Sequence, residues 1–196
     1  MSVPLYNSLP WSLDEKSCVV LFGAGTSGKT VFIRYFLRQS YEHWAYAVVI
    51  CGGDSAQKDY SSWVPPERIK TLTVDADENA KMLVDTINIH KHLNKLAIDK
   101  GEEPKLMALI FDDILALPGF STYDPPCKNV CHWLATQGRH SKIVSFFSSQ
   151  RLLGIHPTIR GNSGLTCASQ VMSPEDRQEL FKMTNRLGFQ SNKDAD

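Results

Sequence analysis

Short apolar runs recur along this chain, and longer segments of mixed polar character separate them. The runs lie at 18–22, 44–51, 69–74, 105–111 and 143–148, with a weaker one at 165–172. Runs of this length, rich in Val, Ile and Phe, are typical of strands that are covered on both faces, as in parallel sheets. We therefore expect a mostly parallel sheet.

The intervening segments carry helix signals. Helices are expected over 28–38, from Asp75 to about Lys100, over 126–138, and from Ser173 to a stop at Gly188. Asp75 and Glu78 form a capping pattern, and Ser173 precedes a proline at a first helical position. Residues 52–68 are rich in turn formers and are expected to be a loop. Strands that alternate with helices predict a three-layer α/β domain with helices on both faces.

Length and composition fit a single domain. The chain has 196 residues, of which 42% are hydrophobic and 21% charged. This composition excludes a chain that is disordered throughout. We assign residues 1–15 to a lead-in, 16–188 to the folded domain and 189–196 to a flexible tail.

The net charge limits the kinds of partner that the protein can bind. The 21 Lys and Arg residues equal the 21 Asp and Glu residues, so the formal net charge is zero. This balance excludes histone-like proteins, which bind polyanions through a large net charge. It leaves open a DNA-binding protein that gathers its positive charges on one face.

Several features bear on cellular location. No apolar run is long enough to cross a bilayer, and the first residues lack the basic-then-apolar pattern of a signal peptide. The five cysteines are odd in number and scattered, which favours a reducing compartment. We expect an intracellular protein that is not secreted and has no membrane span.

The first strand leads directly into a phosphate-binding motif. Residues 23–30 read GAGTSGKT and fit the Walker A pattern G-x-x-x-x-G-K-[ST]. Glycines let such a loop wrap an anion with its N–H groups, and the following helix adds the positive end of its dipole. Lys29 is expected to reach the β- and γ-phosphates, and Thr30 to bind Mg²⁺. The alternative is a glycine-rich turn with an unrelated lysine. The expected nucleotide-binding residues are Gly23, Ala24, Gly25, Thr26, Ser27, Gly28, Lys29 and Thr30.

An acidic pair follows the apolar run at 105–111, as in a Walker B motif. Asp112 is expected to bind Mg²⁺ through water, and Asp113 to polarise or position the attacking water. An acidic residue directly after the metal ligand favours hydrolysis over phosphoryl transfer to a small acceptor. The alternative is a pair of helix N-cap residues, since aspartate favours such positions.

A polar residue also follows the run at 143–148. The carboxyl ends of parallel strands meet at one edge of a sheet, so Gln150 is expected beside the phosphate loop. There its amide would sense the γ-phosphate and orient water. The alternative is an ordinary polar strand end.

Two arginines are candidates for an arginine finger. Arg139 precedes the run at 143–148 and should lie at the opposite end of that strand from Gln150. It could reach the nucleotide of a neighbouring subunit in a ring, as a finger supplied in trans, or simply close a helix C-terminus at the surface. Arg160 is a second candidate, for a finger or for a DNA contact.

Taken in order, the segments GAGTSGKT, LIFDDIL, GRHSKIVSFFSSQ and HPTIRGN resemble the DNA-packaging ATPases of poxviruses and other large DNA viruses. These are P-loop motors of the FtsK/HerA class, and the resemblance covers residues 17 to about 172. It implies a RecA/FtsK-like P-loop fold with ATP and Mg²⁺ as cofactors. It also implies the nucleotide, Walker B and sensor roles given above, with Arg139 as the trans-acting finger and Arg160 as a second arginine of less defined role.

The resemblance further implies partners. Such motors form pentameric or hexameric homo-oligomeric rings that drive double-stranded DNA, without regard to sequence, into a preformed capsid. The expected partners are therefore DNA, further copies of the chain, and a capsid or portal vertex protein. The expected location is the host cell, with association with the virion.

We expect an ATP-hydrolysing DNA translocation motor that packages viral DNA, with loops 52–63 and 118–128 as candidates for DNA contacts. One alternative is a small-molecule or nucleoside kinase, against which the lack of an arginine-rich lid argues. The other is a non-motor scaffold that binds NTP, against which the intact acidic pair argues.

Overall fold

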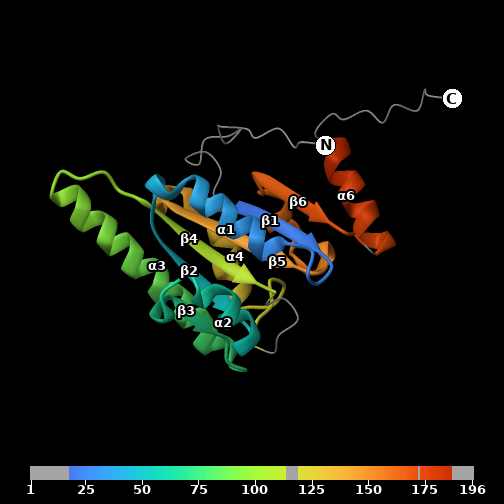
Figure 1. Ribbon diagram of the computed structural model, residues 1–196, viewed down its shortest axis with the longest axis horizontal. Helices are drawn as coiled ribbons and strands as arrows, with labels where there is room; N and C mark the ends of the chain where they lie inside the picture. The colour runs from blue at the N-terminus through green and yellow to red at the C-terminus, as the bar shows by residue number, and fades with distance from the viewer. Residues whose placement is uncertain (1–17, 114–118, 172, 187–196) are drawn as a thin grey trace.

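The computed structural model describes residues 18–113, 119–171 and 173–186, and within these ranges six strands form one parallel sheet (Figure 1). The sheet order is β3-β2-β4-β5-β1-β6, and every neighbouring pair is parallel. The predicted parallel α/β fold is therefore confirmed. The strands are β1 (Cys18–Gly23), β2 (Trp44–Cys51), β3 (Ile69–Thr71), β4 (Leu106–Asp112), β5 (Ile143–Ser149) and β6 (Leu165–Ser169).

The burial of each strand, central or at the edge of the sheet, explains how apolar its sequence is. The central strands β1, β4 and β5 are buried at every residue, so their sequences are apolar almost throughout. The edge strand β6 is only partly buried, which accounts for its weaker apolar run.

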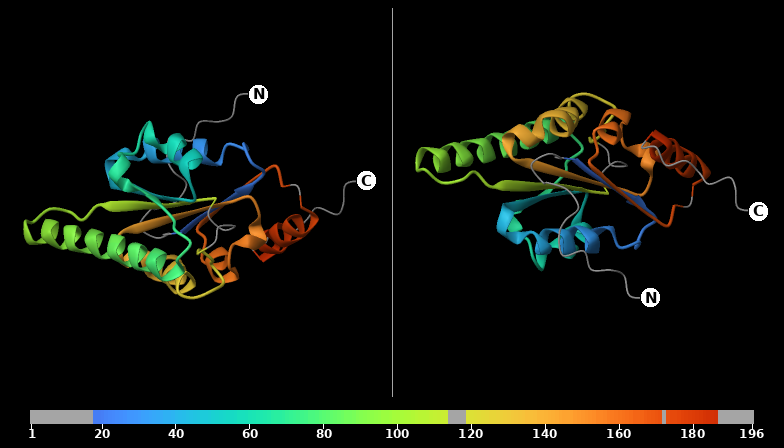
Figure 2. Two further views of the ribbon diagram at one scale, coloured as in Figure 1. Left: turned by 90° about the horizontal axis from the view of Figure 1, so that it is seen from below. Right: turned by 90° about the horizontal axis from the view of Figure 1, so that it is seen from above.

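Helices cover both faces of the sheet (Figure 2). On one face lie α1 and α2, and on the other lie α3, α4 and α5, with α6 beside the edge at β6. The α-helices are α1 (Lys29–Gln39), α2 (Asp54–Ser61), α3 (Ala76–Asp99), α4 (Cys127–Gln137), α5 (Pro157–Gly161) and α6 (Pro174–Arg186). Short 3₁₀ turns are η1 (Tyr41–His43), η2 (Pro66–Arg68), η3 (Gly138–Ser141) and η4 (Leu152–Gly154).

Each face of the sheet has its own hydrophobic core. Under α1 and α2, Ile33 and Phe36 pack with Phe146 of the central strand β5. On the opposite face, the rings of Phe111 and Phe147 stack at 4.8 Å beneath α3 and α4. Full burial of a large apolar side chain stabilises a fold by about 1.5–3 kcal/mol, so the two cores hold the strand ends in fixed register.

Local helix signals are reproduced closely. The Asp75 carboxylate accepts hydrogen bonds from the backbone N–H groups of Asp77 and Glu78, at 2.9 and 3.1 Å, and α3 begins at the next residue. The start predicted from the capping pattern is confirmed. Within the described residues, no helix combines the length and apolar character needed to cross a membrane.

The predicted loop at 52–63 is wrong, because α2 occupies most of it. The segment carries too few apolar residues for a helical period to emerge: Tyr60 is fully buried, while Lys58 and Asp59 beside it are exposed. Tertiary burial of Tyr60, rather than periodicity, stabilises this helix.

The second candidate DNA loop, 118–128, is described from Gly119 onward and passes into α4 at Cys127. It is attached to the segment after β5, since the hydroxyls of Thr122 and Tyr123 donate to the carbonyls of Gly154 and Leu153 at 3.2 and 2.7 Å. The assigned lead-in 1–15 and tail 189–196 lie outside the described residues.

Candidate functional site

Sheet order determines which polar residues meet. Strand β5 lies between β1 and β4, and Ser148 is in register with both Leu21 and Asp112. The phosphate loop follows β1, the acidic pair closes β4, and Gln150 follows β5. All three segments therefore emerge at the same edge of the sheet, as expected for carboxyl ends of parallel strands.

The phosphate loop is shaped by its contact with β6. Gly23 has φ +149°, and a Cβ there would lie 1.7 Å from the carbonyl oxygen of Ser169, so only glycine fits. The Ser169 hydroxyl also donates to the carbonyl of Ser27 at 3.1 Å. Gly28, with φ +86°, then turns the chain into α1. The conformation of the loop is thus fixed by contacts within the chain.

Lys29 folds back over this loop. Its Nζ donates to the carbonyl oxygens of Gly23 and Ala24, both at 2.9 Å. Its positive charge also acts on Asp112, lowering the pKa of that carboxyl group against the stronger opposing effects. The Lys29 ammonium group therefore lies against the phosphate loop and close enough to Asp112 for its charge to act on that carboxyl group.

Asp112 is a buried carboxylate, only 7% exposed. Burial raises its pKa, and the charge of Asp113 raises it further, whereas the nearby hydroxyl groups of Ser148 and Tyr60 and the charge of Lys29 lower it. An ionised carboxylate in such a place is costly unless a cation neutralises it. This environment favours a cation beside Asp112.

Asp113 and Gln150 form a hydrogen-bonded pair. The Gln150 Nε2 donates to Asp113 Oδ2 at 2.7 Å, and both side chains are exposed. Asp113 has φ +50°, and its backbone N–H donates to the carbonyl of Ser148 at 3.1 Å. Aspartate tolerates this left-handed conformation, which redirects the chain at the end of β4. The structure thus brings together two residues that the sequence only placed at the ends of separate strands.

Three hydroxyl groups at this edge are buried without a hydrogen-bond partner among the described residues. They belong to Ser27 of the phosphate loop, to Tyr60, and to Ser148 beside Asp112. Buried polar groups almost always have partners, so orphans gathered at one place indicate ligand atoms still to be supplied. The oxygen donors of Thr30 and Asp112 are of the kind that Mg²⁺ prefers, and they fit a metal bound together with a nucleotide.

Tyr60 is a site residue that the sequence pattern does not predict. It lies on α2, and its hydroxyl is close enough to Thr30 and Asp112 for both to affect its pKa. The segment around it is polar and turn-rich, so the only signal is a single aromatic residue a few positions after Gly52-Gly53.

Arg139 lies far from the candidate site of its own chain. It is exposed in η3, before β5 begins, and its Nε donates to His140 Nε2 at 3.4 Å. The seven residues of β5 separate it from Gln150, and at 3.3 Å per residue they span about 20 Å. Its side chain is therefore presented to the outside of the molecule, at the opposite end of the sheet.

Arg160 has a different environment from the one expected. It is only 7% exposed, its Nη1 donates to the carbonyl of Ile155, and its Nη2 pairs with Glu179 Oε1 at 2.9 Å. The guanidinium group is thus engaged within the chain, and the role of Arg160 as a finger or DNA contact stays a prediction. Glu179 comes from α6, so the pairing depends on packing that local sequence does not indicate.

Comparison with known proteins agrees with this architecture. A family model described as Poxvirus A32 protein matches residues 10–192. No curated protein matches the chain.

Solved structures share the fold at low sequence identity. The genome packaging NTPase B204 from Sulfolobus turreted icosahedral virus 2, in complex with ATP-gammaS, has a TM-score of 0.60 and 15% identity, over 90% of this chain and 88% of that chain. EssC (ATPases 2 and 3) from Geobacillus thermodenitrificans has a TM-score of 0.63 and 12% identity, over 87% of this chain and 35% of that one.

The cytoplasmic domain of EssC has a TM-score of 0.64 and 13% identity, over 95% of this chain. This chain spans only 38% of that domain's length. These structural likenesses establish the P-loop ATPase fold, and the family match extends over nearly the whole chain. The resemblance seen in the ordered motifs is confirmed: this chain belongs to the Poxvirus A32 protein family.

Proposed function

We propose that this protein hydrolyses ATP with Mg²⁺ and uses the energy to translocate double-stranded DNA during viral genome packaging. The observation that carries the proposal is the meeting of three groups at one sheet edge: the phosphate loop, the buried Asp112, and the hydrogen-bonded pair of Asp113 and Gln150. Membership of the Poxvirus A32 family supports it. So does the shared fold with B204, whose structure is that of a genome packaging NTPase.

Each residue has a distinct task in the proposed reaction. The N–H groups of the phosphate loop and Lys29 bind the β- and γ-phosphates. Thr30 and Asp112 would hold Mg²⁺, Asp112 through water, and the metal supplies neutralisation of the charge on the phosphate oxygens. These groups orient the γ-phosphate for in-line attack.

Asp113 and Gln150 act on the attacking water. Asp113 accepts a proton from that water as its oxygen bonds to the γ-phosphorus, while the bond from the γ-phosphorus to the β–γ bridging oxygen breaks. ADP and inorganic phosphate leave. The amide of Gln150 holds the Asp113 carboxylate through their 2.7 Å hydrogen bond, so loss of the γ-phosphate is sensed at the end of β5.

In the proposed pentameric or hexameric ring, each subunit supplies a positive charge, that of Arg139, to the nucleotide site of its neighbour. Arg139 is exposed at the end of the sheet opposite to the phosphate loop. A head-to-tail contact that closes into a ring would place it beside the neighbouring subunit's nucleotide. A finger in trans would make hydrolysis depend on assembly.

The proposed partners follow from the task. Lys and Arg side chains would contact DNA phosphates without reading base sequence. A capsid or portal vertex protein would hold the ring on the capsid, in the host cell or on the virion.

The decisive experiment is ATP hydrolysis by the purified protein with and without long double-stranded DNA, with Lys29→Ala as the inactive control. We expect Mg²⁺-dependent turnover that DNA increases and that Lys29→Ala abolishes. Turnover that requires a nucleoside acceptor would identify a kinase instead. Tight ATP binding without turnover, with or without DNA, would identify a non-catalytic scaffold.

A further inference from the structure

A buried polar network lies at the end of the sheet that carries Arg139, opposite to the candidate site. Its centre is His90 of α3, whose side chain is fully buried. The hydroxyl of Tyr46, on β2, lies 3.2 Å from His90 Nδ1, and His90 Nε2 lies 3.0 Å from the carbonyl oxygen of Lys142. The network therefore joins α3 and β2 to the residue that directly precedes β5.

The partners of His90 determine which ring nitrogen carries the proton. A carbonyl oxygen can only accept, so Nε2 carries the hydrogen and donates to Lys142, and Nδ1 accepts from the Tyr46 hydroxyl. The amide nitrogen of Asn94 is also 3.1 Å from Nε2, but both polar ends of that amide already pair with the backbone of Lys105. Burial lowers the pKa of His90, which keeps the ring neutral and this arrangement in place at neutral pH.

The carbonyl group that His90 contacts belongs to a turn with an unfavourable backbone conformation. Lys142 has φ +57°, in the left-handed region, and its N–H closes η3 by donating to the carbonyl of Arg139 at 3.0 Å. Its own carbonyl accepts from two donors, the backbone N–H of Met107 on β4 at 2.9 Å and His90 Nε2. Such a conformation persists only where surrounding contacts stabilise it, so both donors help to hold this turn.

This turn sets the direction in which Arg139 leaves the sheet. Arg139 lies on η3, three residues before Lys142, and its side chain is exposed. An apolar residue would fill the place of His90 without the cost of burying an imidazole, yet it could not donate to the Lys142 carbonyl. The buried donor is therefore matched to the turn that carries the proposed finger.

We propose that His90 is a positioning residue for the arginine finger: by donating to the Lys142 carbonyl, it fixes the turn after η3 so that Arg139 points toward the nucleotide of the neighbouring subunit. This inference rests on the proposed function, and within it on the finger in trans. Loss of the donor should lower kcat for ATP hydrolysis and leave the KM for ATP nearly unchanged, because the nucleotide site of the same chain stays intact.

His90→Leu tests this, since it removes the donor and keeps a side chain of similar size. His92→Leu is the matched control, because His92 is exposed on the same helix. His90→Gln keeps an amide N–H at a position comparable to that of Nε2. In the assembled protein we expect kcat to fall about 10-fold in His90→Leu, to keep its wild-type value in His92→Leu, and to be largely restored in His90→Gln. A wild-type kcat in His90→Leu would overturn the inference.

Mixtures of subunits distinguish a misplaced finger from a general loss of structure. His90→Leu subunits should regain activity when they are mixed with Asp113→Asn subunits, which keep a working finger and lack the catalytic carboxylate. They should gain nothing from Arg139→Ala subunits, because neither kind of subunit then supplies a working finger. The reverse pattern would place the defect in the nucleotide site of the same chain and overturn the inference, and so would the absence of a gain with both.

The reference mixture is Asp113→Asn with Arg139→Ala. If assemblies that contain both of these variants stay inactive, the finger in trans fails and this inference fails with it. If the wild-type protein does not hydrolyse ATP, the proposed function itself fails.

His90→Asn takes the place of His90→Leu if circular dichroism shows that the leucine variant does not fold. Its shorter amide keeps a partner for the Tyr46 hydroxyl and does not reach the Lys142 carbonyl, so it removes only the contact with the turn. The same fall in kcat and the same pattern of recovery are expected, and the same outcomes would overturn the inference.

Discussion

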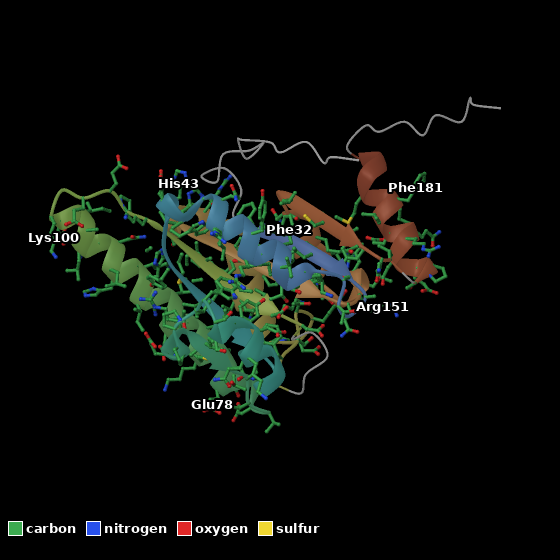
Figure 3. All side chains as sticks on the ribbon, viewed as in Figure 1. Phe32, His43, Glu78, Lys100, Arg151 and Phe181 are labelled. Carbon is green, nitrogen blue, oxygen red and sulfur yellow. The ribbon has the colours of Figure 1, made fainter. Side chains whose placement is uncertain are left out.

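Arg151 and Asp176 form an ion pair, with Arg151 Nε 2.6 Å from Asp176 Oδ2, that joins the end of β5 to the first turn of α6. Figure 3 labels Arg151 at this junction. Asp176 is buried and also accepts a hydrogen bond from the backbone N–H of Leu153 at 3.0 Å. Since Arg151 directly follows Gln150, this carboxylate holds in place the segment on which the proposed sensor depends.

Asp176→Ala should destabilise the protein by about 1–3 kcal/mol, because it leaves the Leu153 N–H without an acceptor. Arg151→Ala leaves the Asp176 carboxylate, only 3% exposed, without its cation but still with the Leu153 N–H donor. It should therefore cost less than Asp176→Ala, about 1 kcal/mol. Urea denaturation of both variants measures the difference. Equal losses would mean that the ion pair, and not the backbone contact, is the main contribution of Asp176.

Gln150→Ala should lower kcat for ATP hydrolysis by about 10–100-fold, because Asp113 loses the donor that orients it. The KM for ATP should change little, since Gln150 does not belong to the phosphate loop. Steady-state kinetics test this, with the exposed Gln178→Ala on α6 as the matched control. A raised KM with unchanged kcat would assign Gln150 to ATP binding instead.

Asp112→Asn should raise the stability of the protein without ligand at neutral pH. The pKa of Asp112 is raised, mainly by burial, so its contribution to folding is favourable only where it is protonated and is lost as the pH rises through that raised value. Asparagine avoids the buried charge. A gain of about 1 kcal/mol corresponds to a rise of about 2–4 °C in Tm.

The pH dependence provides the check on this prediction. The difference in Tm between Asp112→Asn and wild type should shrink as the pH falls toward the ordinary carboxyl value of 3.8. Melting curves across this range, without Mg²⁺ or nucleotide, give the answer. A difference that does not change with pH would mean that ionisation of Asp112 does not cause it.

Mixed assemblies test the finger in trans. Asp113→Asn subunits and Arg139→Ala subunits should each be inactive alone, for different reasons. When they are mixed, some interfaces contain an intact Asp113 on one side and an intact Arg139 on the other, so part of the ATPase activity should return. Assemblies that contain both variants and stay inactive would argue against a shared site.

The strands of the fold could be predicted from the sequence where every residue of a strand is buried. Strands β4 and β5 are buried on both faces, so their sequences are largely apolar and identify them without any knowledge of their partners. The edge strand β6 and the helix α2 were harder, because partial burial leaves a mixed pattern that many structures share.

In the candidate site, too, some features could be predicted from the sequence and others could not. The phosphate loop is contiguous, and its glycines are needed for a local reason, so residues 23–30 identify it. The pairing of Asp113 with Gln150 was predictable only as nearness at one sheet edge, because the hydrogen bond depends on the register of β4 with β5.

By itself, the sequence determined a parallel α/β domain with a Walker A loop, an acidic pair and a polar residue at the end of a third strand. Each of these features depends on residues that are adjacent in the sequence. Only the tertiary structure decided that Tyr60 is buried with its hydroxyl group unpaired among the described residues and that Arg160 pairs with Glu179. These contacts join side chains from separate elements, and burial against a distant partner leaves no periodic trace in the chain.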